Sequence, residues 1–532
     1  MKLPAAPAAS TRVMDLMPSF MRGLVGLMAA FLLSACGGSD QNATPSTPAT
    51  PQRGALLKSP PTLVASYSVA DLLAQLAGSD VGKLLLPLAY TPQCAIDIYQ
   101  LEYETVGGAS EPTTASGALM VSTGTDAGCS GARPVLLYAH GTNTDKNFNI
   151  ADLSDSANAE GVLLAAIFAS AGYIVIAPNY AGYDSSTLTY HPYLDADQQS
   201  KDMIDALTAA RSALPTLPSA TATDGDKLFI TGYSQGGYVA MATHRALQGA
   251  GAVVTAAAPM SGPYALAAFG DAIFYGHVSL SAPANLTLLI SSYQHAYANV
   301  YAEPTDVFEP AFAADISSLL PSTTAISELY ATGKLPPNEL FMSAPPAPQW
   351  TAFTPPTTPA LFAPTFAIGF GTDNLILNSY RLAYLQDAAA SPDGGFPAVT
   401  TGLPATSPAN ALRQDLKLND LRDWTPNVPV LLCGGDEDPT VFYFDTQLMQ
   451  DYWATHVPAG AVGVLDVDAA ASSGDPYAQL QSAFAAAKAL VASAAVLGGA
   501  TDGGQAAVLA AYHTGLVAPF CVAAVRSFFD AQ

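Results

Sequence analysis

The stretch KLFITGYSQGGYVAMATHRAL, residues 227–247, places Ser234 between glycines where one residue pattern ends and another begins. A mostly apolar run typical of a buried strand leads into GYSQG (232–236), and a helix-like pattern follows. A serine at such a sharp turn has a strained backbone and an exposed hydroxyl, and glycines beside it avoid steric collisions. The alternative is a purely structural glycine-rich turn. We interpret Ser234 as a candidate nucleophile.

Strand-like and helix-like segments alternate around this stretch. Residues 95–106 and 115–122 have the alternation of two antiparallel strands. Short apolar runs typical of buried strands lie at 135–141, 173–178, 227–232, 252–259, 428–435 and 461–467, with helical patterns between them and a last helix at 517–530. This alternation predicts an α/β fold with a mostly parallel central sheet flanked by helices. Functional side chains in such folds gather at the carboxyl ends of the strands.

A serine hydroxyl needs a general base, and the chain contains seven histidines. His244 lies ten residues beyond Ser234 on the same predicted helix, roughly 15 Å away, which excludes it. Position along the chain also argues against His140, His191, His277, His295 and His456. His513 follows the last predicted strand and precedes the final helix. We therefore predict that His513 is the base.

An acidic residue should orient the base, and it is expected after a late strand. The segment LLCGGDEDPTV (431–441) supplies three carboxylates there. We favour Asp438, with Asp436 as the rival because it lies nearer the end of the strand. A carboxylate here would stabilise the imidazolium that forms when His513 takes a proton.

Residues 263–420 do not follow the strand–helix rhythm. They contain helix-like pieces and proline-rich links but no clear buried strand. We expect an insertion that stands over the strand ends as a cap, with a separate domain as the alternative. Its aromatic residues, including those of 361–371, Tyr293, Tyr297, Tyr301, Phe341 and Trp350, are either lining for an apolar site or plain cap core.

Composition limits the classes of partner. The 532 residues include 43 acidic and 19 basic side chains, giving a formal net charge of −24. Hydrophobic residues make up 50% of the chain, ample for a large core of one elaborated domain or two. Nothing here supplies the Lys/Arg surface that phosphates require, so we expect no nucleic-acid partner. The balance suits an exported, soluble protein.

The N-terminal region has the features of a targeting segment. Arg22 precedes the apolar run 23–33, which is too short to span a bilayer stably. The run ends in LSACG (33–37), which resembles a bacterial lipobox that is cut before a lipidated Cys36. An ordinary signal peptide with an unrelated cysteine is the alternative. We predict a lipoprotein attached to the outer membrane, or a periplasmic or cell-surface protein, with extracellular release as a further alternative.

The five cysteines leave four if Cys36 is lipidated, and four cysteines allow three pairings in an oxidising compartment. The most local pairing joins Cys94 to Cys129 and Cys433 to Cys521, and we predict it, with free buried thiols as the alternative. No clustered histidines or spaced cysteine pairs indicate a metal site, so no metal or cofactor is expected.

Taken together, YAHGT (138–142), GYSQGG (232–237), 431–441 and HTG (513–515) resemble the motifs of the α/β-hydrolase superfamily. The chain is similar to lidded secretory lipases and esterases, with residues 95–530 covered. The resemblance implies a Ser234–Asp438–His513 triad that hydrolyses carboxylic esters through an acyl-enzyme. The implied oxyanion hole is formed by the backbone amides of Gln235 and of Gly141 or Thr142.

The expected domain organisation follows from these segments. It comprises a signal peptide with the lipidated cysteine (1–36), a disordered linker (37–62), a first core part (63–262), the cap (263–420) and a second core part (421–532). The expected partners are an apolar acyl-ester substrate and, through the N-terminal lipid, a membrane. The function classes in view are an ester hydrolase, a serine peptidase of the same fold and a non-catalytic surface lipoprotein.

Overall fold

The computed structural model describes residues 52–78, 82–83, 86, 91–155, 158–219, 221–458 and 460–532. The predicted signal peptide, Cys36 and the linker before residue 52 lie outside the described residues.

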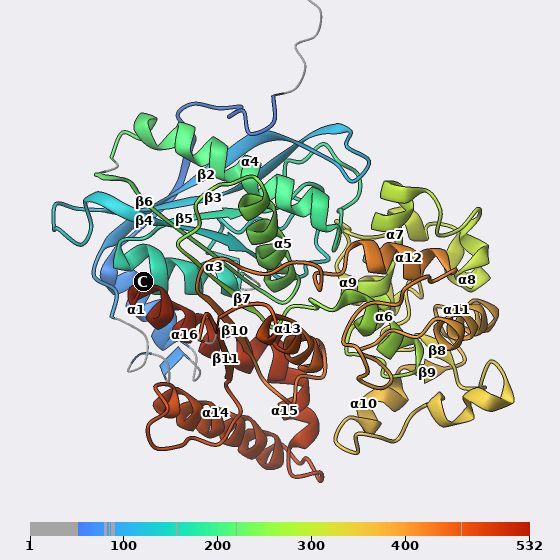
Figure 1. Cartoon of the computed structure of the whole chain (residues 1–532). Helices are drawn as coiled ribbons and strands as arrows, with labels where there is room; N and C mark the ends of the chain where they lie inside the picture. The colour runs from blue at the N-terminus through green and yellow to red at the C-terminus, as the bar shows by residue number, and fades with distance from the viewer. Residues whose placement is uncertain are drawn as a thin grey trace, which may run out of the picture. The chain divides into compact units, whose positions relative to one another are not determined.

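A nine-stranded sheet organises the described part of the chain, in the order β1-β2-β3-β5-β4-β6-β7-β10-β11 (Figure 1). The first four strands in this order pair antiparallel, and β5, β4, β6, β7, β10 and β11 run parallel to one another. The strands are β1 (Thr62–Tyr67), β2 (Ala95–Val106), β3 (Pro112–Thr123), β4 (Gly131–Ala139), β5 (Ile174–Pro178), β6 (Ala222–Tyr233), β7 (Ala256–Met260), β10 (Val430–Gly434) and β11 (Val462–Asp466). The predicted mostly parallel α/β sheet is confirmed.

Helices cover both faces of this sheet, as predicted (Figure 1). Helices α4 and α5 pack on one face, and α1, α3 with the turn after it, and α16 pack on the other. Among the described residues, the helices outside 263–420 are α1 (Val69–Ala77), α3 (Ala159–Leu163), α4 (Ala196–Ala213), α5 (Gln235–Gly249), α13 (Phe444–Ala454), α14 (Ala478–Leu497), α15 (Gln505–Ala511) and α16 (Ala518–Asp530), with the π-helical segments η1 (Leu164–Phe168) and η7 (Tyr512–Val517) and the 3-10 segments η2 (Ala169–Ala171) and η3 (Leu214–Thr216).

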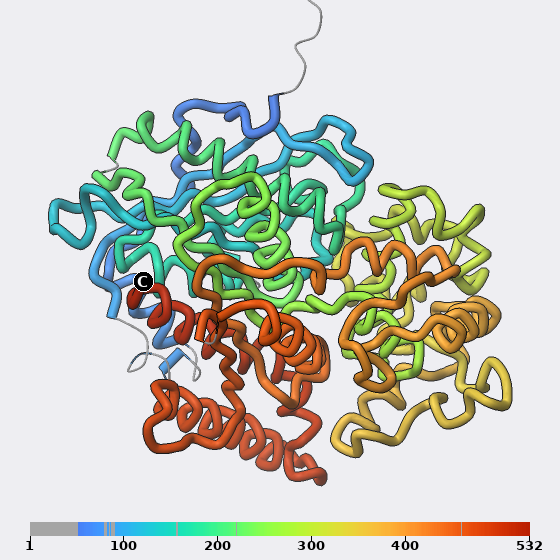
Figure 2. Tube along the Cα trace, viewed as in Figure 1, coloured from blue at the N-terminus to red at the C-terminus, as the bar shows by residue number. Residues whose placement is uncertain are grey.

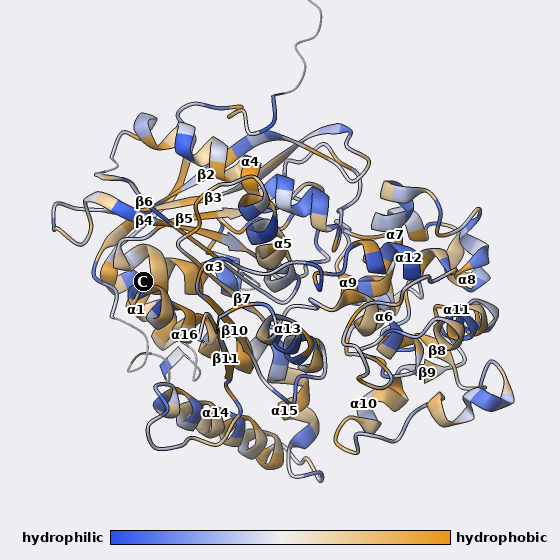
Figure 3. Cartoon of the chain, in the orientation of Figure 1, coloured by the Kyte–Doolittle hydropathy of each residue, from blue (hydrophilic) through white to orange (hydrophobic). Residues whose placement is uncertain are grey.

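The central strands form the core between these helical layers. Residues 135–139 of β4 and 174–177 of β5 are almost completely buried, because both faces of the sheet are covered. Figure 3 shows these strands as the apolar centre of the fold. Continuous apolar runs in the sequence therefore correspond to the interior strands, as expected for a parallel sheet.

Residues 52–61 differ from the expectation of a linker reaching residue 62. β1 pairs only with the first half of β2, up to Gln100. The amides of Gly54 and Leu57 donate to the carbonyls of Glu104 and Glu102, both at 2.8 Å. The side of the second half of β2 that β1 leaves uncovered thus pairs with the preceding segment, because exposed backbone groups of a strand favour pairing.

Residues 263–420, here called the cap segment, contribute no strand to the main sheet. Figure 2 shows the chain leaving the core after β7 and returning before β10. The segment contains α6 (Leu266–Phe274), α7 (Ala282–Tyr297), α8 (Pro310–Ala313), α9 (Ile326–Ala331), α10 (Ala363–Ile368), α11 (Asn378–Ala390) and α12 (Ala411–Leu418), the turns η4 (Pro304–Asp306), η5 (Ile316–Ser318) and η6 (Pro348–Phe353), and the two-residue strands β8 (Phe341–Met342) and β9 (Phe370–Gly371).

Two helical segments near the C-terminus are long and apolar enough, by composition alone, to cross a membrane: Ala478–Leu497 and Gln505–Asp530. The most apolar window of the second is 78% buried, as in a core helix of a folded domain. The first, α14, carries Lys488 near its middle, and this side chain pairs with Glu437 and Asp468 of the sheet core. Both segments are therefore parts of the folded domain.

Two disulfides join Cys94 to Cys129 and Cys433 to Cys521, which is the predicted pairing. Disulfides form and persist in oxidising compartments, so they indicate an exported protein. The second bond is the longer-range one, with a sequence separation of 88 between its cysteines. It links the end of β10 to α16 and thereby joins the two C-terminal parts of the core.

Candidate active site

Ser234 occupies a sharp turn between β6 and α5. Its backbone has φ 61° and ψ −124°, in the left-handed region that a serine rarely adopts. The Ser234 amide donates to the carbonyl of Met260 on the neighbouring strand at 3.0 Å, which ties the turn to β7. The strained conformation is thus held by the sheet, and Ser234 lies at the carboxyl end of its strand.

The glycine after this serine is required by close packing. A Cβ on Gly236 would lie 1.9 Å from the carbonyl oxygen of Ala139, far inside van der Waals contact. Only glycine therefore lets α5 begin directly against the end of β4. The glycines of GYSQGG are explained by the geometry of the turn.

His513 and Asp438 meet although they come from separate segments, His513 from the π-helical segment η7 and Asp438 from the loop after β10. The Nδ1 atom of His513 lies 2.6 Å from Oδ2 of Asp438. Both side chains are buried, and the Nε2 atom of His513 has no hydrogen-bond partner within the described part of the chain. A carboxylate on Nδ1 places the ring proton there and leaves Nε2 to accept a proton, which is the arrangement of a general base.

The acid loop itself holds Asp438 in place. Its Oδ1 atom accepts hydrogen bonds from the amides of Thr440 at 2.9 Å and Val441 at 3.1 Å. Asp436, the rival candidate, lies elsewhere, and its amide donates to Oδ1 of Asp466. Burial and the neighbouring carboxylates raise the pKa of Asp436. The geometry therefore favours Asp438 over Asp436 as the partner of His513.

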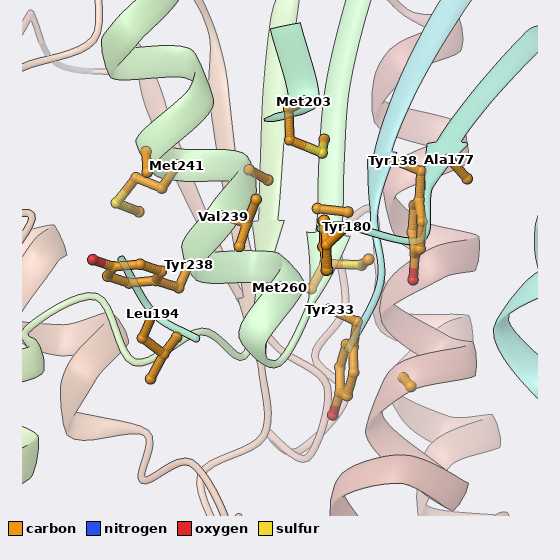
Figure 4. Close-up of a cluster of buried hydrophobic side chains, with 14 of the residues drawn as sticks. Tyr138, Ala177, Tyr180, Leu194, Met203, Tyr233, Tyr238, Val239, Met241 and Met260 are labelled. Carbon is orange, nitrogen blue, oxygen red and sulfur yellow. The ribbon is translucent and has the colours of Figure 1, made fainter. Parts of the chain in front are cut away.

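Tyr233, beside the candidate nucleophile, contacts the candidate base. Its hydroxyl donates to the backbone carbonyl of His513, and the two rings have centroids 4.9 Å apart. Figure 4 shows the Tyr233 side chain at the end of its strand, within a buried cluster. This contact brings the His513 segment to the Ser234 turn. Sequence reasoning missed Tyr233, because a tyrosine inside GYSQGG has no pattern that reveals its partner.

The loop after β4 lies against Ser234. A methyl group added to Gly141 would lie 3.6 Å from Cβ of Ser234. The Gly141 amide, however, already donates to the carboxylate of Glu160 at 3.0 Å, and the Tyr138 hydroxyl donates to the same group at 2.5 Å. Of the two predicted alternatives, Thr142 therefore fits the second oxyanion donor better than Gly141.

Glu160 is a second buried carboxylate near the site that the sequence did not reveal. Burial raises its pKa, while the hydrogen bonds from Tyr138 and Gly141 and the proximity of His513 favour the charged form. Its carboxylate holds the loop that contains Thr142. Glu160 therefore stabilises the position of the predicted oxyanion loop through its hydrogen bond from Gly141.

Gln235 begins helix α5, so its backbone amide lies among the first amides that lack an intrahelical acceptor. Its side chain is held by His191, with 2.7 Å between Gln235 Nε2 and His191 Nε2. His191 lies 2.9 Å from the Ala181 carbonyl through Nδ1, and burial lowers its pKa to about 3. A neutral His191 thus donates from Nδ1 and accepts the Gln235 amide proton at Nε2, which fixes Gln235 beside Ser234.

An apolar cavity of about 70 Å³ opens at Ser234 between the core and the cap segment. From the core it is lined by the Ser234 turn, Thr142, Tyr193 and the acid loop, and from the cap segment by α6, α7 and α12. The cap residues that line it are Pro263, Leu266, Phe269, Gly270, Ile273, Phe274, Ser279, Ala282, Asn285, Leu286, Leu289, Leu412 and Leu416. Among the described residues that line this cavity, none carries a charge.

An ion-pair network fixes the walls of the cavity. Arg413 of α12 pairs with Asp271 of α6 at 2.8 Å and with Asp387 of α11 at 2.7 Å. All three side chains are largely buried, so the pairs are little screened by water. The cap helices around the cavity therefore have a defined arrangement.

The aromatic residues expected from the sequence are not those that line the cavity. None of Tyr293, Tyr297, Tyr301, Phe341 and Trp350 is among the residues that surround it. Tyr293 instead donates to the Leu194 carbonyl, and Phe341 packs with Phe274 and Phe370. These residues belong to the cap core, because large aromatic rings are the main filling of a small helical layer.

Comparisons with known proteins agree with this fold. The family model of the prolyl oligopeptidase family matches residues 163–300. The chain is similar to the rice cell wall degrading esterase LipA from Xanthomonas oryzae, with 26% identity and a TM-score of 0.62 over 91% of this chain and 100% of that one. A putative hydrolase from Legionella pneumophila has 20% identity and a TM-score of 0.56, over 77% of this chain and 91% of that one.

No curated protein matches the chain in a sequence search. The structural likeness establishes the α/β-hydrolase fold that the motifs predicted. At the level of function it supports an esterase-like α/β hydrolase.

Proposed function

We propose that the protein is a serine carboxylic-ester hydrolase that acts on apolar acyl esters. The observation that carries the proposal is the buried His513–Asp438 pair, with Nε2 of His513 unpartnered, beside a serine on a strained strand-to-helix turn. In this proposal Ser234 is the nucleophile, His513 the base and Asp438 the residue that orients it. The likeness to an esterase of 26% identity supports the same reaction class.

The proposed reaction has two halves. The Oγ atom of Ser234 attacks the ester carbonyl carbon while its proton moves to Nε2 of His513. The amides of Gln235 and Thr142 stabilise the oxyanion, and collapse expels the alcohol, which takes the proton from His513. Water then attacks the acyl-enzyme, with His513 again taking a proton, and the carboxylic acid is released.

The cavity supports an apolar acyl group as the substrate part that enters the cap segment. Its walls are aliphatic and aromatic, and the cap helices α6, α7 and α12 supply most of them. Burial of each methylene of a chain there would contribute about 0.8 kcal/mol. We therefore propose that the cap (263–420) selects the substrate through this cavity.

A serine peptidase is the second candidate, because the prolyl oligopeptidase model matches residues 163–300. An aminopeptidase needs an acidic group that holds the substrate amine. The uncharged lining of the Ser234 cavity favours the ester over such a substrate.

A fluorophosphonate probe followed by an ester panel tests the proposal. We expect stoichiometric labelling of the native protein and none of the Ser234→Ala variant. p-Nitrophenyl esters of increasing chain length should be hydrolysed, whereas aminoacyl-anilides should not. Absence of labelling would leave only a non-catalytic role, and turnover of the anilides alone would identify a peptidase.

We also propose that the mature chain is exported and anchored to a membrane by lipid on Cys36. The disulfides support an oxidising compartment. Growth with an alkyne-tagged fatty acid should label the native precursor but not a Cys36→Ser variant. Equal labelling of both would contradict the anchor.

A further inference from the structure

Tyr512 precedes the candidate base and lies against the acid loop. Its hydroxyl accepts a hydrogen bond from the amide of Glu437, the residue before Asp438, at 3.2 Å. A Cβ on Gly435 would lie 2.7 Å from the Tyr512 hydroxyl oxygen. The ring therefore packs directly on the backbone that leads to Asp438, and a side chain at position 435 would have to displace it.

The same hydroxyl is held from the other side. It donates to Oδ2 of Asp468, which follows β11, at 2.6 Å. Lys488 of α14 lies 2.5 Å from that carboxylate oxygen and 2.6 Å from Oε2 of Glu437. Its ammonium group is also 5.5 Å from the centroid of the Tyr512 ring. One lysine thus connects the acid loop, the segment after β11 and the residue before His513.

These contacts are independent of the bond between His513 and Asp438. They involve the chain neighbours of both residues, Tyr512 and Glu437, and join them through a buried hydroxyl. The neighbour of Ser234 behaves alike, since Tyr233 donates to the His513 carbonyl. Contacts of Tyr512 and Tyr233 therefore fix the backbone positions of His513 and the acid loop, in addition to the His513–Asp438 hydrogen bond.

We propose that Tyr512, held by Asp468 and Lys488, is a positioning residue that sets the geometry between the acid loop and His513, with α14 as the element that supplies the lysine. This inference rests on the proposed function. α14 is largely exposed to solvent and lies in the long connection between β11 and His513. Helix α14 places the ammonium group of Lys488 between the carboxylates of Glu437 and Asp468. Without this cation the two carboxylates would face each other where the acid loop and the segment after β11 meet the residue before His513.

The chain contains a matched control at the opposite end of the sheet. The Tyr173 hydroxyl donates to Asp530 at 2.8 Å, and Arg526 binds the same oxygen and lies 4.9 Å from the Tyr173 ring centroid. Tyr173→Phe therefore removes a part-buried tyrosine–aspartate hydrogen bond beside a cation, like Tyr512→Phe, but at the amino end of β5. A difference in kcat between the two variants would therefore come from where the hydrogen bond lies in the fold, and not from the loss of a hydrogen bond alone.

The test measures kcat and KM on a p-nitrophenyl ester, the rate of fluorophosphonate labelling and Tm for the full mature chain. For Tyr512→Phe and Lys488→Met we expect kcat and the labelling rate to fall about tenfold, with KM within twofold of native. Tyr173→Phe should keep native kcat with a similar loss of Tm. Lys488→Arg should recover most of the activity, because it retains the charge and can span both carboxylates.

Several outcomes would overturn the inference. A native kcat in Tyr512→Phe and Lys488→Met, or the same kcat loss in Tyr173→Phe, would show that the contacts only stabilise the fold. A rise in KM without a change in kcat would place the effect in binding. If Tyr512→Phe does not fold, the kcat and the labelling rate of Lys488→Met alone test the inference. A native protein that does not react with the probe would refute the proposed function, whereas a reactive native protein with unchanged variants refutes only this inference.

Discussion

The imidazole of His513 and the carboxylate of Asp438 form a buried 2.6 Å pair across 75 residues of chain. Asp438 lies in the loop after β10, and His513 lies in η7, the π-helical segment between α15 and α16. The carboxyl ends of parallel strands lie at one edge of the sheet, so segments that follow different strands can meet there. The pair is the structural centre of the proposed catalytic site.

Replacement of Asp438 by Asn should lower kcat by about 10,000-fold, because the amide stabilises neither the imidazolium nor the required tautomer. Asp436→Asn is the matched control, since Asp436 lies two residues away and its amide donates to Asp466 instead. Steady-state ester hydrolysis measures both. A large loss of kcat in Asp436→Asn with little loss in Asp438→Asn would reverse the assignment.

Glu160→Gln should lower kcat about tenfold or more with little change in KM. One acceptor oxygen becomes an amide donor and the charge is lost, so Gly141 and Tyr138 must share one neutral acceptor oxygen in place of two carboxylate oxygens. The oxyanion loop then loses its support. Tyr138→Phe removes only one of the two donors and should cost less. If kcat of Glu160→Gln equals that of the native enzyme, the loop does not depend on Glu160.

The two disulfides should differ in their effect on activity. Removal of either pair should lower the free energy of unfolding, by about 4 kcal/mol for Cys94–Cys129 and about 4–5 kcal/mol for the longer loop of Cys433–Cys521. Only the second joins the strand before the acid loop to the helix after His513. The Cys433→Ala/Cys521→Ala variant should therefore lose kcat as well. Equal kcat in the two double variants at low temperature would contradict this.

Ile273→Trp should shorten the acyl chain that the enzyme accepts. Ile273 lines the cavity at Ser234, and a larger ring there would fill most of the available volume. We expect kcat/KM to fall at least tenfold for long-chain esters and to stay near native for acetate. Ile368→Trp is the control on the exposed surface of the cap segment. A uniform loss over all chain lengths would indicate a misfolded cap instead.

Asp202 should contribute stability that increases as the pH falls from 8 to 6. Burial raises its pKa from 3.8 to about 7. Above pH 7 the carboxylate is charged in the folded and the unfolded chain. As the pH falls through about 7, the folded state takes up the proton first, so folding is favoured by about 1 kcal/mol at pH 6.

Asp202→Asn removes this titration. The free energy of unfolding of the native protein, measured relative to that of the variant, should therefore be larger at pH 6 than at pH 8. Both proteins contain the same other titratable groups. The difference between their dependences of stability on pH therefore isolates the contribution of Asp202. Parallel slopes would show that Asp202 does not titrate in this range. Asp202 also accepts the Ala181 amide at 2.6 Å, which connects it to the loop that holds His191.

Local patterns were sufficient for the sheet and for the three principal residues. The boundaries of β2, β5 and α16 agree with the patterns within one residue, because strand alternation and helix periodicity are properties of consecutive residues. Ser234 and its glycines could be recognised for the same reason. His513 and Asp438 followed from chain order and the topology of a parallel sheet.

Contacts between distant segments could not be predicted in this way. Tyr233, Glu160, His191 and Tyr512 act through partners that are far away in sequence, and no periodicity records which hydroxyl meets which carboxylate. The same limit applies to the cap segment, where the choice between lining the cavity and filling the core depends on how helices pack. β1 and the segment before it were also missed, since an edge strand is half exposed and has a weak apolar pattern.

The amino-acid sequence by itself determined the α/β class and the serine turn, and it predicted the order of the proposed nucleophile, acid and base, because each depends on local conformation or on the order of strands. The tertiary structure showed that Asp438 and not Asp436 contacts His513, that the Gly141 amide is bound to Glu160, and which cap residues surround the cavity. These choices depend on distances and burial between segments far apart in the chain, which exist only after the chain has folded.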